Sequence, residues 1–160
     1  MDFEQQSFVR SSKLLKSFWH VQRNLARYVQ KTAMANDLSV PQFFLLKTIA
    51  PLGAVTQKQL GETIQLPKST LSQAVDGLVQ AELVMRQPVK DNRREMQLTI
   101  SEKGKTLFET IRLQKGSIQQ TMEKAIDTLT EEQYEELLAI HLKIATFLEK
   151  EATEQGECSK

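Results

Sequence analysis

Apolar residues near the start of the chain recur at the spacing of a helix that packs lengthwise against another helix. Within residues 8 to 35 the main apolar positions are four, three, four and three residues apart, a repeat of about 3.5 residues. Such a long seam needs more partner surface than one small domain offers, so it favours a dimer interface; a core helix of a monomer is the alternative. The seam consists of Leu14, Phe18, Val21, Leu25 and Tyr28.

Two more helices are predicted at the end of the chain. Residues 102 to 127 continue a helical apolar pattern, in which Gly116 favours a bend because glycine weakens a helix by about 1 kcal/mol relative to alanine. The last helix begins after Thr130, a good N-cap, and its tail after Glu151 is expected to fray. Its apolar residues spread over a wide arc, which indicates burial on more than one side. Those assigned to dimerisation are Leu137, Ile140, Ile144 and Phe147.

The middle of the chain is divided into shorter segments. After a polar break, Ser39 can cap a helix that runs to about residue 50. Thr56 and Gln59 match the capping-box pattern and open another short helix. A turn at residues 65–67 then leads into a helix that ends near residue 81.

Two strands are predicted next, at residues 83–88 and 96–100, and the polar, basic loop 90–94 joins them. The order helix, turn, helix, strand, basic loop, strand is that of a winged helix-turn-helix, which reads a DNA major groove with its second helix. The predicted fold is therefore mainly α with a small antiparallel β wing. The long terminal helices are expected to form an intertwined dimerisation region.

The second helix of this motif begins with small hydrogen-bonding side chains. A helix that enters the major groove presents its N-terminal residues to base edges. Gln73 can pair with adenine through two hydrogen bonds, and Lys68 suits a guanine edge or a phosphate. Small polar residues also begin many ordinary surface helices, which is the alternative interpretation. The predicted DNA contacts of this helix are Lys68, Ser69, Thr70, Ser72 and Gln73.

The loop between the two strands places arginines on a hairpin. Arg93 and Arg94 suit the minor groove, where the negative potential attracts a flat cation. Asp91 cannot favour DNA by its charge, and we expect it to hold the head of Arg93 through a salt bridge. A few mixed charges on a lone loop are usually only solvated. The preceding helix-turn-helix favours the functional interpretation.

The overall composition agrees with a soluble globular protein. Of the 160 residues, 40% are hydrophobic and 26% are charged, and no apolar run approaches the roughly 18 residues of a membrane span. The N-terminus lacks the basic and then apolar order of a signal peptide. The single cysteine, Cys158, cannot form an internal disulfide. A cytoplasmic location without membrane contact follows as the default.

The net charge is only +1, but its distribution is uneven. Residues 10–31 carry six basic and no acidic side chains, whereas residues 123–157 carry ten acidic and three basic ones. Two solvated helix faces that attract each other are one interpretation. In the other, the basic helix adds positive potential near DNA phosphates.

The sequence offers no support for catalysis. It has no nucleophile beside a base, no phosphate-binding glycine loop and no paired catalytic carboxylates. The histidines, His20 and His141, could line a ligand pocket or share a metal, but two histidines without clustered cysteine or carboxylate are a weak metal signal. We therefore expect no enzyme activity, no cofactor and no metal site.

Several short segments between residues 59 and 104 match the motifs of one known family. They are Gln59-Leu60-Gly61-Glu62, Pro67-Lys68-Ser69-Thr70-Leu71-Ser72, Val75-Asp76-Gly77-Leu78-Val79, Leu83-Val84, Asp91-Asn92-Arg93-Arg94 and Leu98-Thr99-Ile100-Ser101-Glu102-Lys103-Gly104. In these segments the chain resembles the MarR-type winged-helix transcriptional regulators. The resemblance includes the long terminal helices and so spans nearly the whole chain. Its wing is fairly specific, whereas many winged-helix families share the opening of the second helix.

The resemblance implies a triangular homodimer, whose two winged domains meet successive major grooves of a pseudo-palindromic operator. It divides the chain into a dimerisation helix (1–36), a DNA-binding domain (37–104), and dimerisation helices with a polar tail (105–160). On the family pattern Arg93 is the minor-groove arginine and Asp91 its aligning partner. Ser69, Thr70, Ser72 and Gln73 match groove and phosphate contacts.

Two features depart from the family pattern. Its thiol-sensing members carry a cysteine near the N-terminal helices, and Cys158 lies far from that position, so oxidant control is not expected. Pro67 stands where many such helices have a capping serine, so Ser69 or Thr70 would have to compensate.

The predicted function is sequence-specific binding of double-stranded DNA by a homodimer, which represses transcription by covering a promoter. As in the family, a small ligand bound between the helical body and the winged domains is the expected effector. A winged-helix module that binds proteins and has lost DNA binding is the alternative. A small enzyme is a third hypothesis, which the missing catalytic residues oppose.

Overall fold

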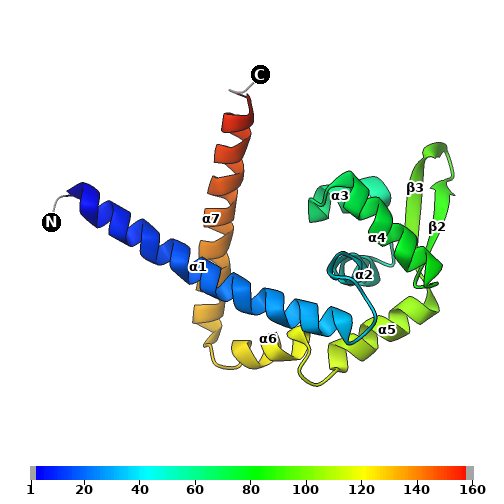
Figure 1. Cartoon of the computed structure of the whole chain (residues 1–160), viewed down its shortest axis with the longest axis horizontal. Helices are drawn as coiled ribbons and strands as arrows, with labels where there is room; N and C mark the ends of the chain where they lie inside the picture. The colour runs from blue at the N-terminus through cyan, green and yellow to red at the C-terminus, as the bar shows by residue number, and fades with distance from the viewer. Residues whose placement is uncertain (1–2, 158–160) are drawn as a thin grey trace. The chain divides into compact units, whose positions relative to one another are not determined.

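The computed structural model describes the backbone of residues 3–157 and the side chains of residues 5–154. This part of the chain holds seven helices and a three-stranded antiparallel sheet, which confirms the predicted fold class (Figure 1). The described residues form two compact units, divided after Gln120. The elements in chain order are α1 (Phe3–Met34), α2 (Val40–Leu52), β1 (Ala54–Thr56), α3 (Gln57–Ile64), α4 (Lys68–Gln80), β2 (Val84–Val89), β3 (Asn92–Ile100), α5 (Glu102–Leu113), α6 (Ile118–Ile126) and α7 (Glu131–Glu157).

The helix α2 is central to the winged domain, and its start is capped as expected. Ser39 Oγ accepts a hydrogen bond from the Gln42 N–H at 3.3 Å, and Gln42 Oε1 accepts one from the Ser39 N–H at 2.8 Å. The helix ends at Gly53, whose φ of +72° favours glycine. Phe44 on the outer side of this helix is 41% exposed, whereas the next residue, Leu45, is fully buried.

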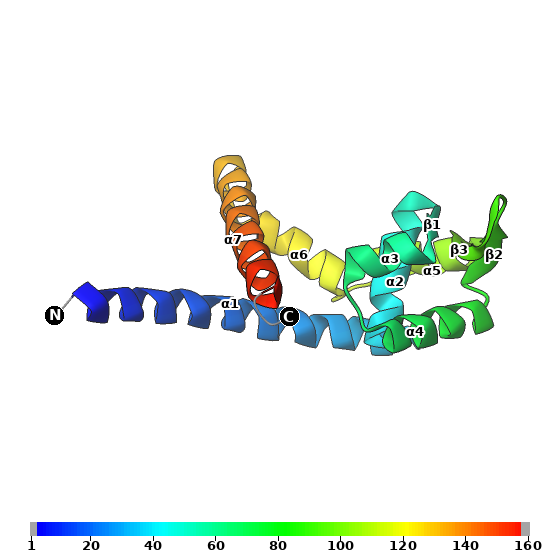
Figure 2. The same ribbon diagram turned by 90° about the horizontal axis from the view of Figure 1, so that it is seen from above.

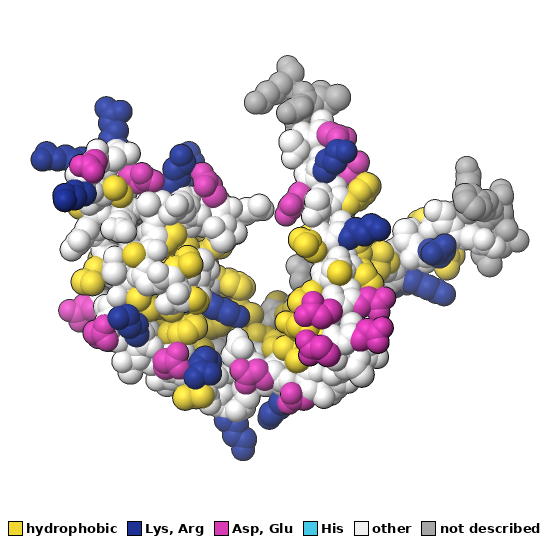
Figure 3. Space-filling view, turned by 180° about the vertical axis from the view of Figure 1, so that it is seen from behind, with side chains coloured by type: hydrophobic (Ala, Val, Ile, Leu, Met, Phe, Trp, Pro, Cys, Tyr) yellow, Lys and Arg dark blue, Asp and Glu magenta, His cyan; other side chains and the backbone are white. Residues whose placement is uncertain are grey.

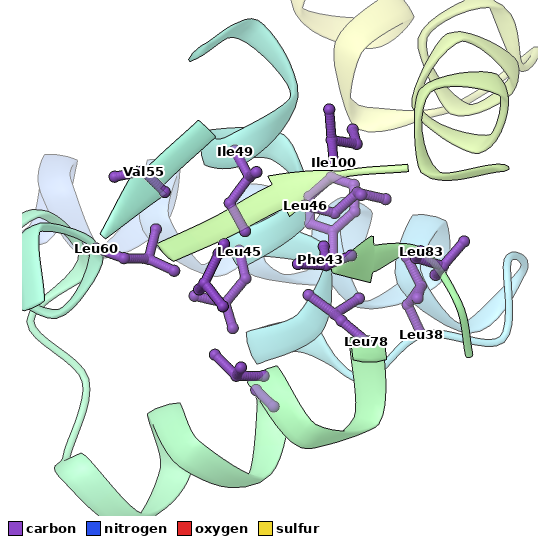
Figure 4. Packing of buried hydrophobic residues seen from close by; sticks show 14 of the residues in the cluster. Leu38, Phe43, Leu45, Leu46, Ile49, Val55, Leu60, Leu78, Leu83 and Ile100 are labelled. Carbon is purple, nitrogen blue, oxygen red and sulfur yellow. The ribbon is translucent and has the colours of Figure 1, made fainter. Parts of the chain in front are cut away.

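The core of the winged domain lies between α2, α3, α4 and the sheet. Leu45, Leu46 and Ile49 of α2 are at most 1% exposed. Figure 4 shows side chains of α2, α4 and β3 gathered in one interior, among them Leu78 and Ile100. Burying one such aliphatic side chain stabilises the fold by about 1.5–3 kcal/mol. This cluster therefore holds α4 and the hairpin on one common support.

The strand β1 was not predicted. It is only three residues long and pairs with β3, so the strand order is β1-β3-β2. Val55 of β1 lies opposite Leu98 of β3, and both side chains are buried. Three residues are too few to show an alternating pattern. Their pairing depends on a strand much further along the chain.

The predicted second long helix is in fact two helices, α5 and α6. Gly116 between them has a φ of +76°, which no α-helix contains, so the expected bend is a complete break. Two hydrogen bonds fix this break to the end of α1. Asn36 Nδ2 donates to Gln114 Oε1 at 2.8 Å, and the Ile118 N–H donates to the buried hydroxyl of Thr32 at 3.0 Å.

The second unit contains the end of α6 and all of α7. Thr130 caps α7 as predicted: its Oγ1 accepts from the Gln133 N–H at 3.2 Å, and Gln133 Oε1 accepts from the Thr130 N–H at 3.0 Å. The helix continues to Glu157, so the expected fraying after Glu151 is wrong. Polar residues with good helix propensity extend a helix without burial. Cys158 lies outside the described residues. Within them, no helix combines the length and the apolar character needed to cross a membrane.

Candidate nucleic-acid interface

The helices α3 and α4 form the predicted helix-turn-helix. Thr56 Oγ1 accepts from the Gln59 N–H and Gln59 Oε1 from the Thr56 N–H, each at 3.1 Å, so the capping box of α3 is confirmed. Gln65 ends α3 in the left-handed conformation. Gly61 approaches α4 so closely that an added methyl group would lie 3.1 Å from Leu71 Cδ2. A glycine at this position lets the two helices pack closely.

The helix α4 has one buried and one exposed face, and it lies along an edge of the domain with the hairpin rising from its far end (Figure 2). The buried residues are Leu71, Ala74, Val75 and Leu78. Four of the five predicted DNA contacts are exposed, whereas Thr70 is half-buried. The exposed four are Lys68, Ser69, Ser72 and Gln73. These side chains therefore share the outer surface of one helix.

The first turn of α4 carries no side-chain cap. Pro67 stands at the N-cap position and supplies no acceptor. Contrary to expectation, Ser69 and Thr70 do not compensate, since their side chains make no hydrogen bond within the described part of the chain. The N–H groups of a first helical turn have no partner within the helix. Together with the positive end of the helix dipole, they suit an anion such as a phosphate.

The wing arginines lie in β3 and not in a loop, which corrects the predicted loop boundaries. The tip of the hairpin is only Lys90 and Asp91. Beyond it the register of β2 and β3 shifts, which leaves Arg93, Arg94 and Glu95 in a bulge without paired residues on β2. Bulges re-aim side chains at functional sites. Figure 3 shows Lys and Arg side chains projecting from this end of the winged domain, with acidic side chains among them.

The predicted salt bridge between Asp91 and Arg93 is not among the ion pairs of the described residues. Both side chains are exposed. The turn is held instead by Asn92, whose Oδ1 accepts from the Arg94 N–H at 3.2 Å. Alignment of Arg93 by Asp91 therefore stays a prediction for the DNA-bound protein.

A contact that was not predicted joins α4 to the wing. Arg86 Nη1 of β2 donates to Asp76 Oδ1 of α4 at 2.7 Å. A sequence signal for it exists: Val84 and Arg86 are two positions apart on one strand and so share a face of the sheet. Because Val84 is buried, Arg86 also faces the helices.

An apolar cavity of about 160 Å³ lies in the first unit, between α2, α5 and the start of α6. Its apolar lining is Phe43, Leu46, Phe108, Ile111 and Ile118, and its polar lining is Lys47, Arg112 and Gln119. The Arg112 guanidinium also pairs with Glu109, through a 2.9 Å contact from Nε to Oε2. An apolar wall with two nearby cations suits a small molecule that has an apolar body and an anionic group.

The residues assigned to dimerisation are mostly uncovered in the single chain. On α1, Leu14 and Val21 are exposed, Phe18 is half-buried, and Leu25 packs partly against the core. On α7, Leu137, Ile140 and Phe147 are exposed and Ile144 is half-buried. Each helix thus presents apolar surface that soluble monomers rarely leave open.

Within the described residues, neither His20 nor His141 belongs to a group of three potential metal ligands.

Comparison with known proteins agrees with this geometry. Residues 38–96 match the sequence model of the MarR family. The uncharacterized HTH-type transcriptional regulator YwhA from Bacillus subtilis (strain 168) is 27% identical over 127 residues, which are 76% of this chain and 89% of YwhA. The multiple antibiotic-resistance repressor MarR from Listeria monocytogenes is 26% identical with a TM-score of 0.54, over 90% of this chain and 99% of that one. A cysteine-to-serine variant of MarR from E. coli, in complex with operator DNA, has the same fold: its TM-score is 0.70 at 19% identity, again over 90% and 99% of the two chains. Residues 38–96 therefore match the MarR family, and most of the chain is similar to the transcriptional regulators named above.

Proposed function

We propose that this protein binds a pseudo-palindromic operator as a homodimer and represses transcription from the promoter that it covers. The observation that carries the proposal is the exposed polar face of α4 beside an arginine-bearing hairpin, with one core supporting both. In a winged helix-turn-helix the second helix enters the major groove, and basic side chains beside it reach the minor groove. The operator complex of E. coli MarR supports this use of the shared fold.

The DNA contacts differ in role. Gln73 reads an adenine through two hydrogen bonds, whereas Lys68 and the N–H groups of the first turn of α4 hold phosphates. Arg93 enters the minor groove, and Asp91 aligns it once DNA is bound. The remaining exposed contacts, to phosphates or bases, come from Ser69, Ser72 and Arg94.

Dimerisation covers the apolar surfaces of α1 and α7. A second copy of the chain fits them because it brings the opposite charge: residues 10–31 are wholly basic in their charged positions, and residues 123–157 are mainly acidic. The two recognition helices of such a dimer dock only if the half-sites are about one helical turn apart. A small change in their separation therefore lowers the affinity for DNA.

A small ligand in the cavity between α2 and α5 is the proposed releasing signal. The helix α2 packs directly on α4, since a methyl group added to Gly77 would meet the Gln42 side chain. A ligand that binds more tightly when α2 is displaced shifts the population toward the displaced state, and α4 moves with α2. The lining favours a small aromatic acid, whose carboxylate would lie near Lys47 or Arg112.

The proposal is tested with DNA from upstream of the protein's own gene, by gel shift and footprinting. We expect a protected region with two half-sites about one helical turn apart. The matched control is a protein with both Gln73→Ala and Arg93→Ala, which should protect nothing at the same concentration. If the wild-type protein also selects no site from random DNA, a protein-binding role for the winged domain is favoured instead. A monomer in sedimentation at micromolar concentration would contradict the dimer.

A further inference from the structure

The ion pair between Asp76 and Arg86 joins the two elements to which the proposed function assigns DNA contacts. Asp76 lies on α4 and Arg86 on β2, and the Nη1–Oδ1 distance of 2.7 Å makes the ion pair a hydrogen bond as well. Three other ion pairs of the described chain link residues three or four positions apart on a single helix. Those local pairs do not affect how elements are arranged, whereas the Asp76–Arg86 pair ties the recognition helix to the wing.

The position of Arg86 in the hairpin directs it toward α4. Arg86 lies opposite Leu98 on β3, and Val84 lies opposite Ile100. Residues directly opposite each other share one face of a sheet. Because Val84, Leu98 and Ile100 are buried, this face is the one that packs on the helices. Arg86 stands at its margin with its side chain 34% exposed, within reach of Asp76.

Asp76 is a carboxylate on the face of α4 that is assigned to DNA. It follows Gln73 by three residues and its side chain is 61% exposed. A negative charge there opposes binding to phosphates unless a cation neutralises it. Arg86 provides that cation, and the carboxylate in return fixes the direction of the guanidinium. An exposed ion pair adds little to stability, so stability alone is a weak reason for an acid at this position.

The junction between α4 and β2 is also held by hydrogen bonds from Ser101 and Lys103, at the start of α5. Ser101 Oγ donates to the Glu82 carbonyl at 2.6 Å, and Lys103 Nζ donates to the Ala81 carbonyl at 2.8 Å. These bonds fix the base of the hairpin but touch nothing further along it. The strand β1 also pairs with β3 from Gln97 to Thr99, so the motion left to the hairpin is a tilt of the part beyond these residues. The contact from Arg86 to α4 restrains that tilt.

We propose that the Asp76–Arg86 ion pair is a positioning contact that sets the tilt of the wing relative to α4, so that Gln73 and Arg93 reach adjacent grooves of one duplex. The inference rests on the proposed DNA binding. From Arg86 to the hairpin tip at Lys90 the strand spans about 13 Å, at roughly 3.3 Å per residue. A tilt of about 5° at Arg86 therefore moves the tip by about 1 Å over that length. A shift of this size exceeds the roughly 0.5 Å range of hydrogen-bond lengths.

Asp76→Asn is the deciding variant, because it removes the ion pair and a negative charge near DNA in one step. If Asp76 acted only through its charge, this variant would bind the operator more tightly. A positioning contact predicts the opposite sign: operator binding about three- to tenfold weaker, the size of coupling between residues in contact. Asp76→Glu keeps the carboxylate and should keep most of the affinity.

Glu82→Gln is the matched control. It removes one negative charge from the same corner, where Glu82 Oε2 lies 3.9 Å from Lys103 Nζ, but it leaves the tie between α4 and β2 intact. Its operator affinity should equal or slightly exceed that of the wild type. The double variant Asp76→Asn with Arg86→Gln restores the local net charge without the contact. It should bind as weakly as Asp76→Asn alone, and wild-type affinity for it would contradict the proposal.

The affinity lost on substitution of Arg93 in the wing distinguishes a positioning role of the ion pair from a merely structural one. Arg93→Ala should cost less affinity in the Asp76→Asn background than in the wild type, whereas Gln73→Ala should cost the same in both. Tighter or unchanged binding by Asp76→Asn, or losses that add independently of Arg93, would overturn the positioning role. A wild-type protein that binds no operator would refute the proposed DNA binding, which distinguishes the two failures.

Discussion

Arg93→Ala removes an exposed guanidinium from the bulge of β3 without disturbing the core. In a homodimer the loss occurs twice. Each phosphate charge that a protein neutralises adds about 0.9 to the slope of log K against log salt concentration. If each Arg93 neutralises one phosphate charge, the slope for the variant dimer should be shallower by about 1.8. The reason is that fewer counterions are released when the variant binds.

The assay is fluorescence anisotropy of a labelled operator at salt concentrations from roughly 50 to 200 mM. Over this fourfold range, a slope difference of about 1.8 changes the ratio of wild-type to variant affinity by about twelvefold. The variant should therefore lose most affinity at low salt. Lys115→Ala is the control, because it removes an equal and exposed charge from the break after α5, at the opposite end of that helix from the sheet.

Parallel salt plots for Arg93→Ala and the wild type would refute the minor-groove role of Arg93. A shallower slope for both Arg93→Ala and Lys115→Ala would point instead to net charge, since the two positions share nothing else. Only a change that is confined to Arg93 supports a wing that grips DNA.

Gln73→Ala should relax specificity at one base pair of each half-site, at a cost of about 1–3 kcal/mol, and competition between operator variants measures this. Equal losses on every variant would exclude base reading by Gln73. Thr32→Val leaves the buried Ile118 N–H without its acceptor and should lower the free energy of unfolding by about 1–3 kcal/mol, as urea titration would show; an unchanged midpoint and slope would mean that this bond contributes nothing. Phe147→Glu replaces an apolar side chain that is exposed in the single chain, so it should dissociate the dimer without unfolding the protomer. An unaltered dimer in sedimentation would remove Phe147 from the interface.

The parts of the fold that local chemistry determines were predictable from the sequence. The caps at Ser39, Thr56 and Thr130 each depend on a side chain only three residues further on, and all three occur as expected. The helix-turn-helix and the hairpin followed from the same kind of short-range pattern. The exposed polar positions of α4 were also predictable, because the buried stripe of a helix determines its opposite face.

The features that were missed depend on residues far apart in the chain. The strand β1 exists only because β3 returns beside it. The break at Gly116 is fixed by Thr32, which no window around the glycine contains. The contact of Arg86 was not predicted because its partner lies on another element. The alternation of side chains along β2 indicates only that Arg86 shares a face with Val84. Side-chain pairs between elements can be identified only when the packing of those elements is known, and local sequence patterns do not determine that packing.

Because Pro67 supplies no side-chain cap at the start of α4, the serines proposed to contact DNA are not needed to hold that helix. Ser69 and Ser72 are exposed and cap nothing, so replacing them removes no support from the helix. New operator preferences can therefore arise by exchange of these side chains one at a time, with no compensating change in the interior. The same independence makes α4 a convenient place to redirect the protein to a chosen DNA sequence.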